Sequence, residues 1–510
     1  MVGVAGKSRG CNTCRKRKIA CDQQKPVCGQ CTRSNRVCGG YQKETVFVLV
    51  QPAAEKTHIF IRSPSGSPQG TTENRELVST TSRPPTVLRG NKFTDSFPET
   101  GSAHAIMNRR MACHDLVQAF LLNCFPSWWA PMSQSWIPLL AELPTKGEAL
   151  ELSSAAVAAS ALGYMFNDHA LVKQSLKYYT RGLQQLQRAL RDPGLMHEEG
   201  TLAACMALSL YEGLECPNLG SEGYFNHCQG LIALIQSRGP HVHVLGAGHR
   251  LFLGVRVPAI LFALKHHKST IFSQPTWIEQ PWTGIPKTPH DRVTDCLARA
   301  PVILERVRSL LNLSIPHQVD LLHELFSECW QIDNQLDVIY DEMRRSGPDA
   351  LYWRVPSQTN PLVDCPHSEP PFQVVFCFPN TQIAATLMLL WATRTMLWSG
   401  LSNMYQHLEG IMPFAMALGP DLYQGSIGIS HSRARCAEYL SVAHRVCQSV
   451  EYFLKDEMLL AGPLSVSPAL GIVVDSLRNR PGHGREIAWI QAALGVVRRK
   501  GLRVLEHIDL

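Results

Sequence analysis

The stretch CNTCRKRKIACDQQKPVCGQCTRSNRVC, residues 11–38, holds six of the 17 cysteines of this 510-residue chain. Its spacing is C-x2-C-x6-C-x6-C-x2-C-x6-C, so one unit with the same internal gaps occurs twice. The cysteines of the two units are Cys11, Cys14 and Cys21, then Cys28, Cys31 and Cys38. A repeated spacing of this kind indicates that all six thiols serve one geometric purpose.

Three kinds of cysteine chemistry compete for this stretch. Disulfides suit a secreted protein, but the first ten residues, MVGVAGKSRG, lack the apolar segment of a secretory signal, and the cysteine total is odd. A redox C-x-x-C pair requires a thioredoxin-like strand and helix, which the Lys- and Arg-rich flanks do not provide. Zinc prefers four ligands in a tetrahedron, and C-x2-C lets two thiolates bind one ion. We therefore favour zinc, in an intracellular protein.

Six thiolates fill two tetrahedra only if two of them bridge both ions. The first cysteine of each unit, Cys11 or Cys28, is the predicted bridge. One zinc ion would bind Cys11, Cys14, Cys21 and Cys28, and the other would bind Cys11, Cys28, Cys31 and Cys38. Such a cluster carries net negative charge, which neighbouring cations would offset.

Positive charge is concentrated beside these cysteines. Residues 1–43 contain ten Lys or Arg and one acid, Asp22, for a formal charge of +9, whereas the whole chain carries +7. The remaining 467 residues therefore sum to −2. A compact basic module joined to a near-neutral body predicts an anionic partner that contacts one end of the chain.

The stretch resembles the fungal binuclear zinc cluster of transcription factors. The resemblance rests on the six cysteines at these spacings, on the basic run Arg15–Lys18, and on Pro26, two residues before the fourth cysteine. It implies two zinc ions, two short helices, and a nuclear protein that binds double-stranded DNA and regulates RNA polymerase II transcription. Many members carry Lys or Arg directly before the third cysteine. Ala20 stands there in this chain, so one expected phosphate contact is missing.

The same resemblance places the C-terminal end of the first short helix against a CGG triplet. Arg17 and Lys18 stand at that end and are predicted to contact bases, Lys18 foremost, because such side chains donate to guanine O6 and N7. The predicted phosphate contacts are Arg9, Arg15, Lys16 and Lys25. Arg33 and Arg36 of the second unit are expected to be equivalent to Lys16 and Lys18 and to hold the neighbouring DNA backbone. The basic run could instead be only a nuclear import signal.

Composition divides the chain into three parts. We predict a binuclear zinc cluster domain at residues 8–42, a partly disordered linker at 43–103, and an all-helical regulatory domain at 104–510. Two short apolar runs in the linker, Val46–Val50 and His58–Ile61, predict a β-hairpin. The Pro-, Ser- and Thr-rich segment after them is typical of a flexible tether, and no sustained heptad repeat predicts a coiled coil.

From about residue 104, apolar residues recur at steps of three and four, which predicts a large all-α body. The expected helices include Ile106–Phe125, Leu171–Leu190, Thr201–Leu214, Arg292–Leu311, Val319–Arg345 and Ser430–Lys455. The stretch HCQGLIALIQSRGP (residues 227–240), supported by LMLLWATRTMLW (387–398), resembles the fungal-specific transcription factor regulatory domain. In this stretch the final Gly-Pro pair is expected to stop a helix.

Two features of the body could serve partners. An apolar seam recurs at alternating steps of three and four: Leu322, Leu325, Cys329, Ile332, Leu336, Ile339 and Met343. It could pair two copies in a homodimer, but a helix that buries one face in its own domain is the preferred interpretation. Residues 309–343 also hold seven acids and no Lys or Arg. They could contact the transcription machinery, although a solvated helix face is preferred.

Signatures of catalysis and of membrane insertion are absent from the sequence. It has no G-x-S-x-G motif and no P-loop. GAGHRLFLG (246–254) lacks the third glycine of a dinucleotide loop and is expected to be an ordinary loop. The pairs His241/His243 and His266/His267 are expected at the surface. The apolar segment 380–393 is too short and polar to span a bilayer, so a buried helix is expected. We predict neither an enzyme nor membrane association.

The sequence thus predicts a nuclear, zinc-dependent, sequence-specific DNA-binding regulator of transcription, a class compatible with control of a fungal secondary-metabolite gene cluster. The alternative is a zinc-dependent interaction protein or co-regulator that docks on partners without reading DNA sequence. Salt-dependent binding that ignores duplex sequence would favour this alternative. The sequence leaves open activation or repression, a metabolite ligand of the body, and the oligomeric state.

Overall fold

The computed structural model of the chain divides into two compact units, Met1–Thr100 and Gly101–Leu510. The structure describes residues 11–24, 27–36, 38, 46–48, 58–60, 103–126, 135–144, 146–215, 221–358, 372–418, 429–478 and 482–503. The second unit begins three residues before the predicted start of the helical domain.

The first unit contains two short helices, α1 (Asn12–Lys16) and α2 (Gly29–Arg33). Each begins directly after the first cysteine of one repeat unit, Cys11 or Cys28. Five residues are too few for a helix that is stable alone in water, so these helices depend on what holds their ends together. The pair of short helices that the resemblance implies is confirmed.

The first unit also contains a small antiparallel sheet. Strand β1 (Val46–Val48) pairs with strand β2 (His58–Phe60), and Val46 lies opposite Phe60. These strands fall within the two apolar runs of the linker, so the predicted hairpin is confirmed.

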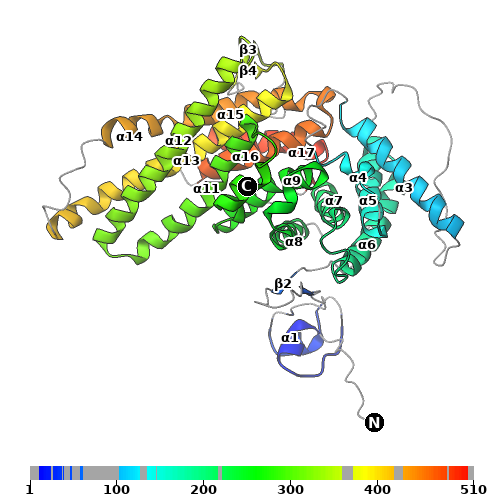
Figure 1. The fold of residues 1–510 in the computed structure, drawn as a ribbon. Helices are drawn as coiled ribbons and strands as arrows, with labels where there is room; N and C mark the ends of the chain where they lie inside the picture. The colour runs from blue at the N-terminus through cyan, green and yellow to red at the C-terminus, as the bar shows by residue number, and fades with distance from the viewer. Residues whose placement is uncertain are drawn as a thin grey trace. The chain divides into compact units, whose positions relative to one another are not determined.

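The second unit is predominantly helical (Figure 1). Its α-helices are α3 (Ala103–Cys124), α4 (Leu139–Glu142), α5 (Glu148–Met165), α6 (His169–Ala189), α7 (Glu199–Glu215), α8 (Glu222–Arg238), α9 (Gly246–His266), α10 (Pro275–Glu279), α11 (Pro289–Ser309), α12 (Ile315–Ser346), α13 (Thr381–Leu418), α14 (Ile429–Ala437), α15 (Tyr439–Leu454), α16 (Ala461–Arg478) and α17 (Gly484–Arg499). Every expected helix is present, although the one expected over Ser430–Lys455 is two helices, α14 and α15, divided at Glu438. The fold class is confirmed.

One element departs from a purely helical body. Strands β3 (Trp353–Pro356) and β4 (Val374–Cys377) form an antiparallel pair around the Pro-rich interruption between α12 and α13. Gln448 of α15 donates to the Val374 carbonyl at 2.9 Å, so a helix side chain satisfies backbone at the edge of this small sheet. The sequence gives no alternating pattern over these residues, because four-residue strands are too short to show one.

Local sequence explains where several helices begin and end. Asp168 caps α6, because its carboxylate accepts from the backbone amides of Ala170 and Leu171. Thr288 and Asp291 form a capping box at the start of α11. Helix α8 ends at Gly239, whose φ of 76° suits glycine, and Pro240 follows. The predicted Gly-Pro helix stop is confirmed.

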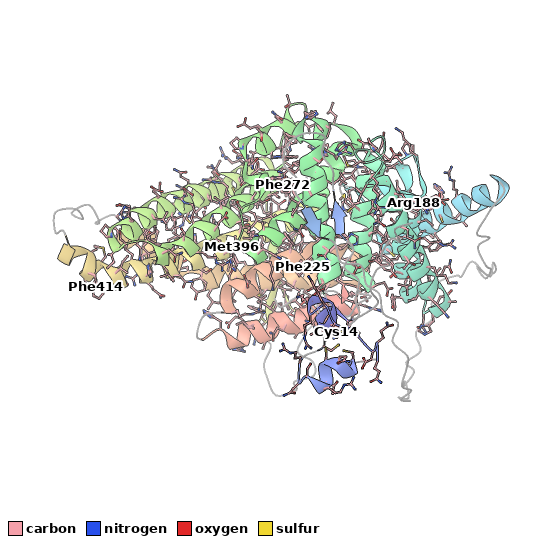
Figure 2. All side chains as sticks on the ribbon, turned by 90° about the horizontal axis from the view of Figure 1, so that it is seen from below. Cys14, Arg188, Phe225, Phe272, Met396 and Phe414 are labelled. Atoms are coloured by element: carbon pink, nitrogen blue, oxygen red, sulfur yellow. The ribbon has the colours of Figure 1, made fainter. Side chains whose placement is uncertain are left out.

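The long helices α12 and α13 pack side by side (Figure 1). Along them, the Phe326 and Tyr405 rings stack at 4.2 Å, and Trp330 Nε1 donates to the Tyr405 hydroxyl at 3.1 Å. All seven residues of the apolar seam are buried within this one chain. The preferred interpretation, a helix that packs in its own domain, is therefore confirmed, and the seam is not free to pair two copies. Phe414, near the C-terminal end of α13 and outside the seam, is exposed (Figure 2).

The acids of α12 are paired with arginines from neighbouring helices rather than simply solvated. Arg306 of α11 pairs with Glu324 and Glu328, and Arg292 pairs with Glu342. The remaining contacts converge on α12 from α13 and α14: Arg394 and Arg435 both pair with the fully buried Asp333 and with Asp337. Five of the seven acids thus join helices of the body. The expected solvated face is wrong for Asp333, which is fully buried, whereas Glu324 stays 66% exposed while it is paired. Sequence alone does not show which arginines lie opposite these acids.

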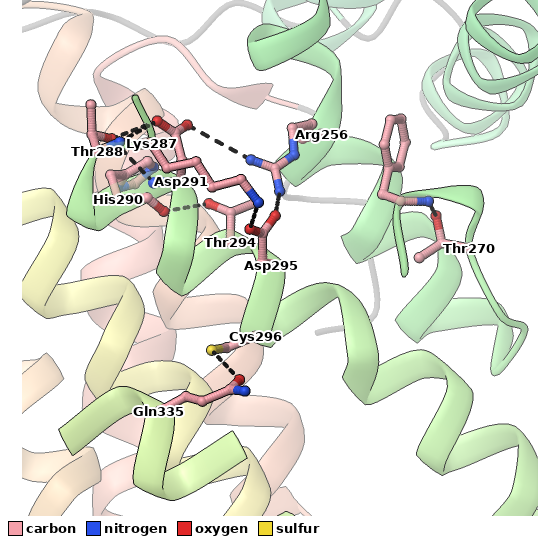
Figure 3. Close-up of polar contacts among 11 residues, drawn as sticks. Arg256, Thr270, Lys287, Thr288, His290, Asp291, Thr294, Asp295, Cys296 and Gln335 are labelled. Carbon is pink, nitrogen blue, oxygen red and sulfur yellow. Dashed lines mark hydrogen bonds and ion pairs between the residues drawn. The ribbon is translucent and has the colours of Figure 1, made fainter. Parts of the chain in front are cut away.

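A second ionic cluster ties α9 to α11 and the segment before it (Figure 3). The Arg256 side chain is 2% exposed and pairs with Asp291 at 3.7 Å and with Asp295. Lys287 pairs with Asp295 at 2.5 Å, and both cations lie 4.6 Å from the centre of the Trp282 ring. A buried cation is tolerated only when it is paired in this way.

The structure corrects two expectations about this region. GAGHRLFLG is the first part of helix α9, not a loop. His243 is fully buried rather than at the surface: its Nδ1 lies 2.9 Å from the Gly248 carbonyl oxygen, and its ring stacks on Phe252 at 5.6 Å. Burial lowers the pKa of His243 to about 4, so its ring is neutral near pH 7. The other three histidines are exposed, as expected.

Among the described residues, α9 is the one helix long and apolar enough to cross a membrane. Half of its apolar window is buried inside the helical body, and this buried face includes the ion-paired Arg256. These contacts are those of a core helix. The expected buried helix over residues 380–393 forms the beginning of α13 and is largely buried.

A carboxylic acid is buried between α6 and α7. Glu212 is 1% exposed and accepts a hydrogen bond from the Tyr179 hydroxyl. Burial raises its pKa from 4.5 to about 7 despite this bond. Gly223 of α8 packs so closely on the carboxyl group that a side chain there would collide with it.

We predict that Glu212 makes the helical body less stable as pH rises from about 4.5 to about 7. In this window the folded protein holds a proton that the unfolded chain has released, so the free energy of unfolding falls by about 3 kcal/mol. Denaturant unfolding of the wild type and of Glu212→Gln at several pH values tests this. The substitution should flatten the pH dependence, whereas Glu279→Gln, the same change at an exposed site, should preserve it. An unchanged slope in Glu212→Gln would contradict the assignment.

Candidate metal centre and nucleic-acid interface

The two repeat units use their first cysteine in the same way. Cys28 is the N-cap of α2, and its Sγ accepts from the Cys31 amide at 3.3 Å. Cys11 precedes α1, and its Sγ accepts from the Cys14 amide, also at 3.3 Å. Amide donors stabilise thiolate sulfur, and such contacts orient metal ligands. The paired geometry follows directly from the C-x2-C spacing at the start of each helix.

The sulfur atoms form two overlapping sets of four. Within each set the Sγ atoms all lie within 4.8 Å of one another. The first set is Cys11, Cys14, Cys21 and Cys28, and the second is Cys11, Cys28, Cys31 and Cys38. The two sets share Cys11 and Cys28, the cysteines that the repeat marks as candidate bridges.

The sulfur spacing fits zinc. Four sulfurs at about 2.3 Å from one zinc ion lie about 3.8 Å apart in a tetrahedron. The Sγ separations are 3.6 Å for Cys11–Cys28, 3.7 Å for Cys14–Cys28 and 3.8 Å for Cys11–Cys31. The six cysteines can therefore hold two tetrahedral ions that share two ligands.

Burial disfavours these thiolates when no metal is bound. It raises the pKa of Cys11, Cys14, Cys28 and Cys31 above the ordinary thiol value of 9.0. Zinc binding must therefore release protons, and the free energy of binding becomes free energy of folding for this small unit. Among the residues of the first unit whose burial the structure describes, the buried ones are cysteines of this cluster.

Asp22, the one acid of the basic module, braces α2. Its Oδ1 accepts from the Gly29 amide at 3.1 Å, and its Oδ2 lies 3.8 Å from Arg33 Nη2. Gly29 lets the Asp22 carboxylate approach its backbone closely, because a Cβ at this position would push that carboxylate away. Asp22 is not among the predicted site residues, although a single acid among ten cations was a usable signal for this role.

Both short helices end in the same backbone motif. Lys18 and Asn35 have left-handed φ values of 53° and 47°. The next amides, of Ile19 and Arg36, donate to the carbonyls of Cys14 and Cys31 at 3.1 and 3.0 Å, which is the bond pattern of a Schellman cap. The equivalent of Lys18 in the second unit is therefore Asn35. The expected equivalence of Arg36 with Lys18 is wrong, because the two units are offset by 17 residues.

Several predicted DNA-contacting residues are exposed around these helix ends. Lys16, Arg17, Lys18, Arg33 and Arg36 are all exposed. Arg17 Nη1 donates to Ser34 Oγ at 3.2 Å, which joins the two units, and Arg33 is paired with Asp22. Lys16 and Lys18 make no ion pair or hydrogen bond to the residues that the structure describes. Arg9, Lys25 and the side chain of Arg15 lie outside the described residues.

Comparison with known proteins gives the module and the body their family. Residues 9–45 match the model of the Fungal Zn(2)-Cys(6) binuclear cluster domain, and residues 113–269 match that of the Fungal specific transcription factor domain. The chain therefore carries the two domains of fungal zinc cluster transcription factors, a binuclear zinc cluster and a regulatory domain. A cluster domain of this kind binds two zinc ions, which agrees with the two sulfur sets. The family is one of transcription factors and not of enzymes.

Individual relatives match limited parts of the chain. White-opaque regulator 2 of Candida albicans is 61% identical over 33 residues, which are 6% of this chain and 7% of that protein. Arginine metabolism regulation protein II of Saccharomyces cerevisiae is 50% identical over 40 residues, 8% of this chain and 4% of that protein. An uncharacterized protein of Emericella nidulans is 25% identical over 205 residues, 37% of this chain and 44% of that protein.

The chain thus spans less than half the length of these curated relatives. No solved structure was found to match this chain. The matched regulatory segment ends at residue 269, but the ionic cluster of Arg256 with Asp291 and Asp295 crosses that limit. The helical domain of this transcription factor therefore continues structurally past the matched segment.

We predict that Cys28→Ala loses both zinc ions, because this thiol belongs to both sulfur sets. Cys21→Ala, which removes a member of one set, should lose fewer ions, and Cys124→Ala, a buried thiol of α3, should keep both. Zinc content per purified full-length chain, measured by atomic emission, tests the series. A Cys28→Ala protein that retains one tightly bound zinc would argue against shared ligands.

Proposed function

We propose that this transcription factor binds double-stranded DNA sequence-specifically through its zinc cluster, with Lys18 as the principal residue that contacts a CGG-like triplet. The observation that carries the proposal is the exposed Lys18 just after the end of α1. Its backbone is held in a left-handed turn, because the next amide, of Ile19, donates to the carbonyl of Cys14, a predicted zinc ligand. The Lys18 ammonium group has no partner among the described residues and three donors to offer.

Zinc supports this role by shaping the module. We assign Cys11, Cys14, Cys21 and Cys28 to one ion and Cys11, Cys28, Cys31 and Cys38 to the other. The two ions would fix both helix ends, and together with six thiolates they would sum to a formal charge of −2. The formal +9 that residues 1–43 carry from their Lys, Arg and Asp side chains then leaves about +7, which favours the DNA phosphates.

The other basic residues take separate roles in this proposal. Arg17 contacts bases beside Lys18. Arg9, Arg15, Lys16, Lys25, Arg33 and Arg36 contact phosphates and set orientation and affinity. Arg33 does so while it is braced by Asp22, so its position is better defined than that of a free side chain.

A nuclear location and an effect on RNA polymerase II transcription follow from this class of protein. One relative is named Transcription activator AMTR1, of Alternaria alternata, and activation is one outcome that reporter assays can distinguish from repression. Control of a secondary-metabolite gene cluster stays a prediction, which transcript profiling after gene deletion would test. A homodimer through the helical domain, if present, must use a surface other than the buried seam of α12.

Selection from a random duplex library by the full-length, zinc-loaded protein tests the proposal. Enrichment of a CGG-containing site would support it, and two triplets at fixed spacing would indicate a dimer. Salt-dependent binding with no enriched sequence would overturn it in favour of an interaction protein that does not read DNA.

We predict that Lys18→Gly separates folding from recognition. Glycine accepts the left-handed φ of 53° without strain, so zinc content should stay at wild-type level and stability should stay equal or rise by up to about 1 kcal/mol. Loss of the side chain should weaken binding by about 1–3 kcal/mol and relax the preference at one guanine.

Asn35→Gly is the matched control, because it makes the same backbone change at the equivalent turn of α2. It should leave base preference unchanged. Equal losses of affinity for all sequences in Lys18→Gly would show that Lys18 contacts a phosphate and not a base. Competition binding with single-base variants of the selected site measures both.

A further inference from the structure

Arg17 and Ser34 occupy the same position in the two repeat units, 17 residues apart, and they touch. Each follows the last residue of its short helix: Arg17 follows α1 and Ser34 is the C-cap of α2. The Arg17 Nη1 to Ser34 Oγ distance is 3.2 Å. The contact therefore connects the two helix ends at the centre of the repeat.

The Ser34 hydroxyl is held by its own helix. Its Oγ donates to the Gln30 carbonyl at 2.7 Å, and the Cys31 carbonyl lies 3.2 Å away. With its proton committed to the backbone, Oγ presents a lone pair in a fixed direction. Arg17 is thus bound by an acceptor that does not rotate freely, unlike most exposed side-chain partners.

The contact leaves the recognition edge of the Arg17 guanidinium available. It engages Nη1, whereas the Nε and Nη2 donors make no contact with the described part of the chain. Two parallel donors on one edge of arginine match guanine O6 and N7. A side chain already held in place loses less conformational freedom when it binds.

We propose that Ser34 is a positioning residue for DNA recognition: it holds Arg17 so that the Nε–Nη2 edge of the guanidinium is presented to a base next to the one that Lys18 contacts. This inference rests on the proposed function. It assigns to the second repeat unit a part in base reading, through a neutral hydroxyl and without a base contact of its own.

A purely structural role fits the contact poorly. The two units are already joined through sulfur atoms 3.6 to 3.8 Å apart, four of which are fully buried. A single solvent-exposed hydrogen bond adds little to stability beside six metal–sulfur ligands. Loss of the Ser34 hydroxyl should therefore leave zinc content and melting temperature unchanged.

A double-mutant cycle on the full-length, zinc-loaded protein tests the proposal. The variants are Ser34→Ala, Arg17→Ala and their combination, with Ser34→Thr as the conservative variant that keeps the hydroxyl. Affinities are measured for the duplex that the wild type selects and for a scrambled duplex of equal length. Zinc per chain is measured for every variant.

We expect Ser34→Ala to bind the selected duplex about threefold to tenfold more weakly, with unchanged affinity for the scrambled duplex and two zinc ions retained. In the Arg17→Ala background the same change should have no further effect, and Ser34→Thr should restore binding. Equal losses on both duplexes, additive losses in the double variant, or tighter binding by Ser34→Ala would each overturn the role of Ser34.

The outcomes separate this inference from the proposed function. If the wild type selects a duplex but Ser34→Ala binds it unchanged, only the positioning role fails. If the wild type selects no duplex at all, the proposed function fails, and the role of Ser34 in recognition fails with it.

Discussion

Two tetrahedral ions require eight ligand positions, and six thiolates supply them only when two sulfurs serve both ions. That constraint places Cys11 and Cys28 at the centre of the module, each at the start of a five-residue helix and each accepting an amide hydrogen from its own first turn. Each helix starts directly after one of these two cysteines and is followed by a left-handed turn, at Lys18 after α1 and at Asn35 after α2. The exposed basic side chains owe their positions to this arrangement, because the buried residues described in the module are the cysteines themselves.

The helical body follows a different principle. Its apolar residues form a conventional core, but its buried charges decide which helices meet. Asp333 is fully buried and receives arginines from α13 and α14, while Arg256 of α9 is matched by Asp291 and Asp295 of α11. A misplaced helix would leave such a charge unpaired, which is far more unfavourable than a misplaced leucine. These clusters therefore disfavour any packing that separates Asp333 or Arg256 from its partners.

The sequence was most informative where ligand chemistry dictates spacing. The cysteine repeat predicts the two sulfur sets, the short helices and the zinc, because a metal site leaves little freedom in the gaps between its ligands. Helical periodicity likewise predicts the main helices of the body. The seam of α12 was correctly interpreted as a buried face.

The failures have equally physical causes. We predicted a loop at GAGHRLFLG because of its glycines. The apolar residues that follow continue helix α9, which packs against the core. The acids of α12 could not be matched to their arginines, since pairing between residues far apart in the sequence leaves no local pattern. Asp333 and Arg435, for example, are more than a hundred residues apart. The equivalence drawn between Arg36 and Lys18 was an error of register, and the left-handed turns at Lys18 and Asn35 correct it.

Under the base-contacting role that we propose for Lys18, its left-handed turn also limits how this protein can acquire new DNA targets. A base-contacting position on a regular helix accepts almost any side chain, so its preference can drift freely by substitution. At φ of 53° β-branched residues are excluded and most others are strained, which leaves a short set of replacements. We therefore expect the preferred DNA sequence to change through substitutions at residues next to Lys18 and through the spacing of paired sites. Lys18 itself is expected to be retained.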